Sequence, residues 1–294
     1  MITIEDQSQP ERAAAKHPVL EKRQVQEVHS SGQTTLISSR MHFLDRQAPR
    51  WIAPIGILII LIVWQGVTGL GWISQADLPS PVSIFSAAVQ MIHSGDLWVN
   101  IEASMGRIVF GYLLGAVSGI VLGVVLGFSR ISERIGIPIA NALYPIPKLA
   151  IIPLIILWIG AGEASKILVI AAEVLFPVLF NTYSAVRNTE PALVRAAVSF
   201  GAPRRTVILR VILPASLPTI FAGLRIGAGL SLLILVAAEM IGAQHGIGAM
   251  ILQYSSLMMT ANVLVGVVLL SILGLLINRG LAQLERWLLP WKSQ

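Results

Sequence analysis

Three ionisable residues, Lys148, Glu173 and Arg225, lie inside long apolar stretches of the sequence. A charge near the centre of a lipid bilayer costs on the order of 2.5–3.5 kcal/mol on insertion scales, so such residues usually face a bundle interior or water. On one interpretation, Lys148 and Arg225 help an anion to pass and Glu173 balances one of them. On the other, the charges form an ion pair that only fixes helix packing, or they snorkel to an interface. The residues alone leave both interpretations open.

Lys148 stands among three prolines, Pro145, Pro147 and Pro153. Each proline removes a backbone donor and disfavours a helical turn before it. In lipid the freed carbonyls need protein or water partners. We therefore expect a broken helix beside a cavity, as at the binding sites of transporters.

A second set of residues lies in the polar segment 187–214, which contains five arginines. Leu193, Ala197 and Phe200 recur at i, i+4 and i+7 and share one face of a helix, and Gly201 is typical of the residue that ends one. Two amphipathic helices in such a loop cannot bury their apolar faces alone. A soluble partner with a groove would explain them.

The sequence shows no catalytic pattern of its own. It contains no G-x-x-x-x-G-K-[ST] phosphate loop, so we expect no ATP site in this chain. It contains no cysteine, which excludes disulfide and thiol chemistry. We expect no bound metal or cofactor, and active transport would draw its energy from a partner or an ion gradient.

The composition indicates a membrane protein. Of the 294 residues 55% are hydrophobic and 12% charged, with a mean hydropathy of +0.76, whereas soluble domains carry about 25% charged residues. The apolar stretches predict an all-α membrane protein with about six transmembrane helices. The expected spans are 51–70, 104–128, 135–159, 164–186, 215–240 and 261–281, with surface helices over 82–94 and 248–258, a short helix over 203–211 and a charged turn over 129–134.

Glycines recur in four-residue steps from Gly111 to Gly127 in the second expected span. Small residues at this spacing form a flat stripe on which another helix can approach closely. We expect a packing surface there.

The positive charge is explained by topology. Of the 21 Lys and Arg residues, 17 lie in 1–50, 129–134, 187–214 and 279–294, and none lies in 71–103 or 241–260. Positive loops stay in the cytoplasm, so both termini are predicted to be cytoplasmic, and nucleic acid is not an expected partner. On this orientation Glu239 is expected near the outer surface in a solvated role.

Three regions follow from this pattern. Residues 1–45 are polar and predict a flexible cytoplasmic tail. Residues 46–103 comprise the first span and the outer surface helix, and residues 104–294 the remaining core with the cytoplasmic loop 187–214.

The loop resembles a known family. Ala196-Ala197, three residues, Gly201, nine residues and Val211-Ile-Leu-Pro214 are similar to the EAA loop of ABC importer permeases, which docks into the ATP-binding subunit as a coupling helix. Arg195 stands where that family usually has Glu. The resemblance implies that the contact with the ATPase includes Leu193, Ala196, Ala197, Phe200, Gly201 and Pro214.

The resemblance extends over roughly residues 80–292. The segments 145–154, 158–160, 163–167, 211–218, 223–227 and 237–239 look like those of taurine, alkanesulfonate and nitrate permeases. This implies a type I importer core of the MetI-like kind, in a multi-pass protein of the bacterial inner membrane in contact with lipid. The implied partners are a second copy of the chain, two cytoplasmic subunits that bind ATP and Mg, and a periplasmic or lipid-anchored substrate-binding protein.

The implied function is import of a small organic or inorganic anion such as a sulfonate, taurine or nitrate, with bicarbonate and neutral vitamin precursors also open. The main alternative is a secondary transporter driven by an ion gradient, which would use the intramembrane charges as a relay. A membrane scaffold without transport is a third possibility. Dependence on ATP separates the first two, and uptake of any solute excludes the third.

Overall fold

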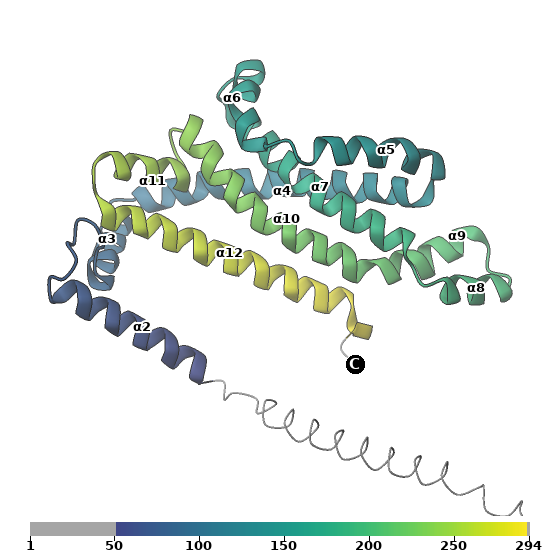
Figure 1. Cartoon of the computed structure of the whole chain (residues 1–294), viewed down its shortest axis with the longest axis horizontal. Helices are drawn as coiled ribbons and strands as arrows, with labels where there is room; N and C mark the ends of the chain where they lie inside the picture. Colours follow the sequence, from purple (N-terminus) through teal and green to yellow (C-terminus); the bar gives the residue numbers. More distant parts are fainter. Residues whose placement is uncertain (1–50, 293–294) are drawn as a thin grey trace, which may run out of the picture. The chain divides into compact units, whose positions relative to one another are not determined.

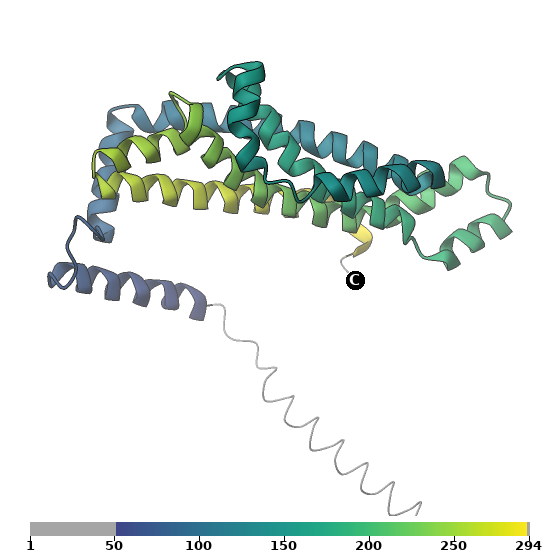
Figure 2. The same ribbon diagram turned by 45° about the horizontal axis from the view of Figure 1, so that its top comes forward.

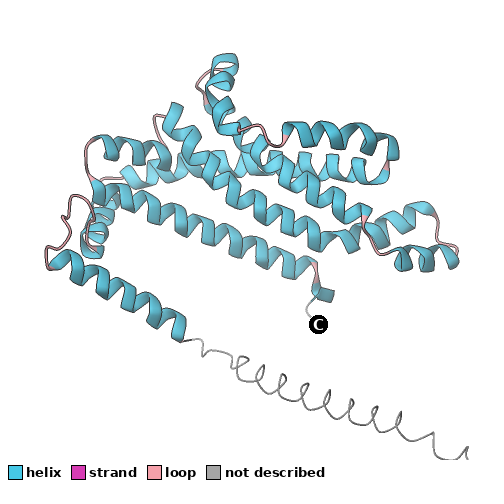
Figure 3. Ribbon diagram, viewed as in Figure 1, coloured by secondary structure: helices cyan, strands magenta, loops and turns pink. Residues whose placement is uncertain are grey.

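The computed structural model describes residues 51–292, apart from the side chain of Ala53, and this part of the chain is helical and contains no strand (Figure 3). The all-α prediction is confirmed. The expected tail, 1–45, lies outside the described residues. The helices labelled in Figure 1 are α2 (Ile52–Gly69), α3 (Pro81–His93), α4 (Asp96–Phe128), α5 (Arg130–Leu143), α6 (Lys148–Ile159), α7 (Glu163–Arg187), α8 (Pro191–Ser199), α9 (Arg204–Val207), α10 (Leu213–Gly242), α11 (Ile247–Ser256) and α12 (Thr260–Leu288). Two further short elements are the π-helix η1 (Ile208–Ile212) and the 3-10 helix η2 (Pro290–Lys292).

Four helices among the described residues are long and apolar enough to cross a membrane: α4, α7, α12 and a continuous helix, Arg204–Gly242, that comprises α9, η1 and α10. The pair α5 and α6 counts as a fifth, broken span. The helix α2 has 18 residues and is about 27 Å long, close to the roughly 30 Å of a hydrocarbon core. Together they occupy the six stretches predicted from the sequence.

The glycine stripe of α4 packs against α7. A Cβ atom built on Gly115 would lie 2.5 Å from the carbonyl oxygen of Ala171, and one on Gly123 would lie 2.6 Å from the Cβ of Thr182. Both distances are shorter than any van der Waals contact, so the two backbones approach this closely only because the stripe lacks side chains. The predicted packing surface is confirmed, and α7 is its partner.

The helix α10 completes the core with α4 and α7. Gly223 and Gly227 of α10 face α7, where a Cβ on Gly223 would lie 2.6 Å from the Cβ of Asn181. The hydroxyl of Tyr112 in α4 donates to the carbonyl of Leu224 at 2.9 Å. These three helices therefore form one tightly packed unit.

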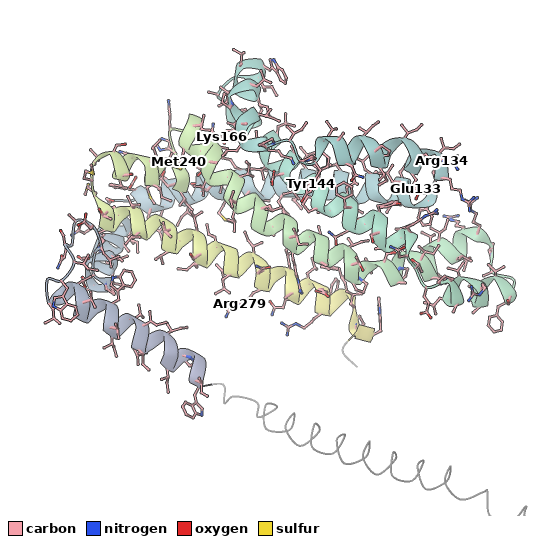
Figure 4. All side chains as sticks on the ribbon, viewed as in Figure 1. Glu133, Arg134, Tyr144, Lys166, Met240 and Arg279 are labelled. Carbon is pink, nitrogen blue, oxygen red and sulfur yellow. The ribbon has the colours of Figure 1, made fainter. Side chains whose placement is uncertain are left out.

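The segment 129–134 is not the expected charged turn, because α5 begins there. The hydroxyl of Ser129 caps the helix by accepting a backbone amide at 3.2 Å. Glu133 (Figure 4) accepts from the hydroxyl of Tyr183 at 2.7 Å and pairs with Arg187 at 3.2 Å. Contacts with α7 thus stabilise a helical turn where the charges alone suggested a loop.

The expected break in the third span lies between α5 and α6. The two helices are inclined by 94°, and α6 turns away from α5 in both views (Figures 1 and 2). Pro145 and Pro147 lack the amide hydrogens that would carry the helix onward, and Pro147 also disfavours the helical conformation at Ile146. The chain therefore changes direction before α6 begins at Lys148.

The short helix expected over 203–211 is not separate from the fifth span. The helix α9 continues through η1 into α10 without an intervening loop, over 39 residues. Pro214 is the second residue after η1, which contains Arg210, the residue four positions before it. A π-helical turn is wider by one residue, which leaves space where a proline ring would otherwise meet the carbonyl four residues before it. The helix can thus pass Pro214 unbroken.

The helices α3 and α11 lie within two residues of the surface helices predicted over 82–94 and 248–258. Their apolar faces meet the start of α12 in a second core that includes Met91, Ile247 and Val265. We call the end of the bundle where α4 and α7 begin and α10 meets α11 the α11 end. The opposite end, where α8 projects, is the α8 end.

Candidate functional site

The helix α8 is the most exposed element at the α8 end. None of its nine residues is buried, and α8 extends beyond the ends of α4, α7 and α12 in both views (Figures 1 and 2). Phe200, directly after α8, is 92% exposed, and Leu193 and Val198 are 46% and 60% exposed. This apolar surface lies outside the candidate spans.

The backbone around Gly201 fixes the shape of this loop. Gly201 has a φ of +74°, a conformation that residues with a Cβ seldom adopt. Its amide donates to the carbonyl of Val198 at 2.9 Å, and the Ala202 amide donates to that of Ala197 at 3.1 Å, which closes the C-terminus of α8. Nothing lies within 4 Å of a Cβ built on Gly201, so its surface is open to a partner.

The docking residues predicted from the sequence divide into two places. Five of them lie on α8 or directly after it, where Ala196 is exposed and Ala197 half-buried. Pro214 lies past η1 in the first turn of α10, half-buried. Between the two places lie the loop 200–203, α9 and η1.

Lys148 lies at the break between α5 and α6, within an aromatic cluster. Its Nζ donates to the carbonyl of Tyr144 and lies 5.0 Å and 4.9 Å from the ring centres of Tyr144 and Phe176. Phe180 meets the ring of Tyr144 edge-on at 5.5 Å. Figure 4 shows Tyr144 at this junction. The electron-rich faces of the two rings stabilise the ammonium charge of Lys148.

Arg225 and Glu173 lie elsewhere. Arg225 pairs with Glu285 of α12, a residue that the sequence reasoning missed. Glu173 is half-buried on α7, and no hydrogen bond or ion pair joins it to Lys148 or Arg225 within the described part of the chain. The carboxylate that balances Arg225 is thus Glu285 and not Glu173.

A buried polar cluster at the α11 end was not predicted. Arg107 of α4, whose side chain is 4% exposed, holds Glu163 with two hydrogen bonds, from Nε at 2.6 Å and Nη2 at 2.7 Å. Its Nη1 donates to Glu239 and to the carbonyl of His245, both at 2.7 Å. One guanidinium thereby joins α4, the start of α7, the end of α10 and the loop before α11.

Glu239 is buried, and the solvated role expected for it is wrong. Its side chain is 0% exposed. It accepts hydrogen bonds from the Ser104 hydroxyl at 2.7 Å and the Gly248 amide at 2.8 Å, in addition to Arg107. Gly246, with a φ of +137°, lies so close that a Cβ there would be 2.5 Å from the carboxyl carbon. The signal in the sequence was Arg107, a cation at the edge of an apolar stretch that required an acidic partner.

Tyr254 of α11 extends the polar contacts at this end. Its hydroxyl donates to the Asp96 carboxylate at 2.9 Å. Burial raises the pKa of the Tyr254 phenol, and the hydrogen bond to Asp96 raises it further. The tyrosine therefore stays neutral and donating at physiological pH. Among residues 51–292 no group of three His, Asp or Glu side chains is placed to hold a metal ion.

The model of a family described as "Binding-protein-dependent transport system inner membrane component" matches residues 119–290, more than half of the chain. The chain belongs to this family. The matched range contains the loop 187–214, the break at Lys148 and Glu239, and it begins after Arg107.

Two curated permeases and one solved structure are similar to the chain. It is 39% identical over 249 residues to the aliphatic sulfonates transport permease protein SsuC of Escherichia coli (strain K12), covering 85% of this chain and 93% of that protein. It is 35% identical over 274 residues to the taurine transport system permease protein TauC of the same strain, covering 89% and 99%. The MetNI methionine ABC transporter in inward facing conformations gives a TM-score of 0.49 at 20% identity, over 66% of this chain and 95% of that chain.

Family membership establishes the general role. The chain is a membrane permease subunit of an ABC importer, and the ATPase belongs to partner subunits. The function predicted from the sequence is confirmed at this level, and the ion-gradient alternative is not supported.

Proposed function

We propose that two copies of this permease form the membrane pathway of an importer for small organic or inorganic anions such as sulfonates, taurine or nitrate. The substrate class is supported by the names of its relatives, which transport aliphatic sulfonates and taurine. A periplasmic or lipid-anchored binding protein delivers the anion. Two cytoplasmic subunits bind ATP and Mg and dock on the two copies of α8.

The exposed apolar surface of α8 is the observation that carries this proposal. A nine-residue helix with no buried residue gains little stability from its own chain. Phe200 and Leu193 lose contact with water when they enter a groove on the ATPase. The left-handed glycine behind them keeps the loop compact, so little ordering entropy is lost on docking.

The mechanism follows from the continuity of the docking segment with a span. Closure of the two ATPase subunits around ATP moves the two docking loops towards each other. Because α9 leads into α10 as one helix, this movement is transmitted to the core and turns the dimer from inward-facing to outward-facing. Hydrolysis of ATP resets it.

We propose that Lys148, Glu173 and Arg225 contribute to the pathway in different ways. Lys148 contacts the anion, supported by its place at the broken helix beside two aromatic rings. Arg225 is held by Glu285, so its positive charge is already balanced. Glu173 has no ion-pair partner in the described part of the chain. Its carboxylate adds a negative charge to the part of the pathway that lies beside the core.

The orientation is part of the proposal. The α8 end faces the cytoplasm, the α11 end faces outward, and both termini are cytoplasmic in a bacterial inner membrane. This is supported by the distribution of Lys and Arg, because 17 of 21 lie in segments assigned to the inside. The apolar outer faces of the spans contact lipid.

Co-purification with the candidate ATPase tests the docking loop. The native chain should retain the ATPase, and Gly201→Trp should lose it, because an indole would occupy the space next to α8. Gly201→Asn is the matched control, since asparagine tolerates a positive φ better than other residues and adds a small side chain. Gly201→Asn should retain most of the binding. An ATPase that never co-purifies with the native chain, or that also remains bound to Gly201→Trp, would refute docking at this loop.

The substrate is tested by uptake into proteoliposomes that contain the whole importer with its binding protein. Uptake of labelled taurine, ethanesulfonate or nitrate should require ATP and should persist when ion gradients are collapsed. Uptake that follows the ion gradient and ignores ATP would contradict the proposal.

A further inference from the structure

Arg107 uses its two sides differently. A guanidinium has five N–H donors in a rigid fork. One side, formed by Nε and Nη2, contacts Glu163 alone, at 2.6 Å and 2.7 Å. Its Nη1 is occupied by Glu239 and the backbone of His245. We call the Nε and Nη2 side the fork edge.

The two carboxylates differ in their access to water. The side chain of Glu239 is 0% exposed and is locked by three donors, whereas that of Glu163 is 62% exposed. No donor other than Arg107 is recorded for the Glu163 carboxylate among the described residues. Rotation of this one side chain would therefore uncover the fork edge to a dissolved anion without disturbing Glu239.

A second cation strengthens the positive field at this place. The side chain of Lys166, one turn along α7, is buried, and its Nζ donates to the carbonyls of Ala161 and Gly162 at 2.8 Å and 3.1 Å. Its charge attracts the Glu163 carboxylate. With Glu163 in place, two cations face two carboxylates. Without it, one positive charge is left over beside an open fork.

We propose that the fork edge of Arg107 is a binding site for a small oxyanion and that Glu163 is its internal occupant. A sulfonate or carboxylate group presents two oxygens at the separation that a guanidinium fork binds bidentately. The site lies at the α11 end, so on the proposed orientation an arriving anion would displace Glu163 and be held there before it moves inward. The choice of a sulfonate as ligand rests on the proposed function, and the oxyanion chemistry rests on the geometry alone.

The test is equilibrium binding of ethanesulfonate to the purified full-length chain in lipid nanodiscs. Glu163→Ala should bind it with a dissociation constant at least about tenfold lower than the native chain, because a tethered competitor at an effective concentration in the millimolar range has been removed. Glu163→Gln, which keeps the shape of the side chain, should show the same direction and serves if Glu163→Ala does not fold. Acetate should compete with ethanesulfonate, and chloride at equal concentration should not.

Two controls isolate the fork. Glu102→Ala removes an exposed carboxylate from the same helix, α4, and leaves the fork edge occupied, so it should bind like the native chain. In the Glu163→Ala background, Arg107→Lys keeps the charge next to Glu239 but removes the fork, and binding should return to the native level.

The inference is overturned if Glu163→Ala and Glu163→Gln bind no more tightly than the native chain. It is also overturned if Glu102→Ala gains as much, which would indicate bulk charge, or if chloride competes equally. The assay contains neither ATPase nor binding protein, so its failure leaves the docking of the ATPase untouched. Failure of the Gly201 experiment would likewise leave this binding result standing.

Discussion

At the scale of single residues, burial of Arg107 and Glu239 is the strongest constraint on the molecule. Both lie in membrane-spanning helices and form an ion pair with each other. Arg107 also donates to the carbonyl of His245, and Glu239 also accepts from the amide of Gly248. An ion pair in such a place is tolerated only when its remaining donors and acceptors are also satisfied. The stability of the α11 end therefore depends on each residue of this cluster.

Replacing Glu239 by Gln should destabilise the chain by about 3 kcal/mol, because removal of one partner leaves a buried charge uncompensated. The thermal unfolding of the purified chain, followed by intrinsic tryptophan fluorescence, measures this. Glu102→Gln changes the net charge equally at an exposed position on α4 and should leave the unfolding temperature unchanged. Equal stability of the two variants would show that the ion pair contributes nothing.

Replacing Lys148 by Ala should reduce ATP-driven uptake at least about tenfold while the chain still assembles with its ATPase, because the cation at the broken helix is lost. Lys148→Arg keeps the charge beside Tyr144 and Phe176 and should retain part of the uptake. Uptake at the native rate by Lys148→Ala would remove this residue from the pathway.

The sequence identified some of these residues and missed others for a physical reason. Lys148 and Arg225 stand out because a cation in an apolar stretch is conspicuous. Glu239 was misjudged because it lies near the end of a span, where a carboxylate can meet either water or an arginine. The choice is made by Arg107, 132 positions away, and no local pattern contains that information.

At the scale of elements, the contact between α4 and α7 explains how the core is held together. The regular spacing from Gly111 to Gly127 was sufficient to predict the stripe, since its period is a property of the helix itself. Its partner could not be predicted, because the complementary ridge of α7 consists of ordinary apolar residues such as Val174 and Val178.

Adding one methyl group to the stripe should destabilise the core. Gly115→Ala would place a Cβ 2.5 Å from a backbone oxygen of α7, and such overpacking costs about 1–3 kcal/mol. Gly106→Ala on the same helix meets nothing within 4 Å and should be neutral. The unfolding temperatures of both variants in one detergent decide this, and a Gly115→Ala variant as stable as Gly106→Ala would refute the close packing.

Prolines show where sequence reasoning about elements reaches its limit. Pro138, Pro153, Pro177 and Pro218 lie inside helices, whereas Pro145 and Pro147 stand at the 94° bend. Two prolines separated by one residue remove two donors from a single turn, which explains the break. A single proline can be absorbed by neighbouring helices or by a π-helical turn, and its surroundings are not visible in the sequence.

At the scale of the whole molecule, the two ends of the helical bundle carry different charged features. The arginine-rich docking loop lies at one end and the buried Arg107 cluster at the other. The distribution of charge along the sequence predicted the two ends, because positively charged loops are retained in the cytoplasm. The polar contacts at each end could not be predicted from the sequence and are seen only in the structure.

The absence of cysteine from the chain allows a direct test of its orientation. Phe200→Cys and Met258→Cys place single thiols at positions that are 92% and 87% exposed, at the α8 and α11 ends. A membrane-impermeant maleimide should label Met258→Cys in spheroplasts and Phe200→Cys only in inside-out vesicles. The unmodified chain is the control and should not be labelled. The reverse pattern would invert the proposed topology.

The uninterrupted helix Arg204–Gly242 has a mechanical consequence. At 1.5 Å per residue it is about 58 Å long, and it carries Arg204 and Arg205 in its first turn and Glu239 near its last. A continuous helix has no flexible loop in which a movement of one end could be lost before it reaches the other. On the proposed mechanism, a shift of its first turn would therefore reach the buried carboxylate of Glu239, unless the wide turn at η1 or the helix at Pro218 yields.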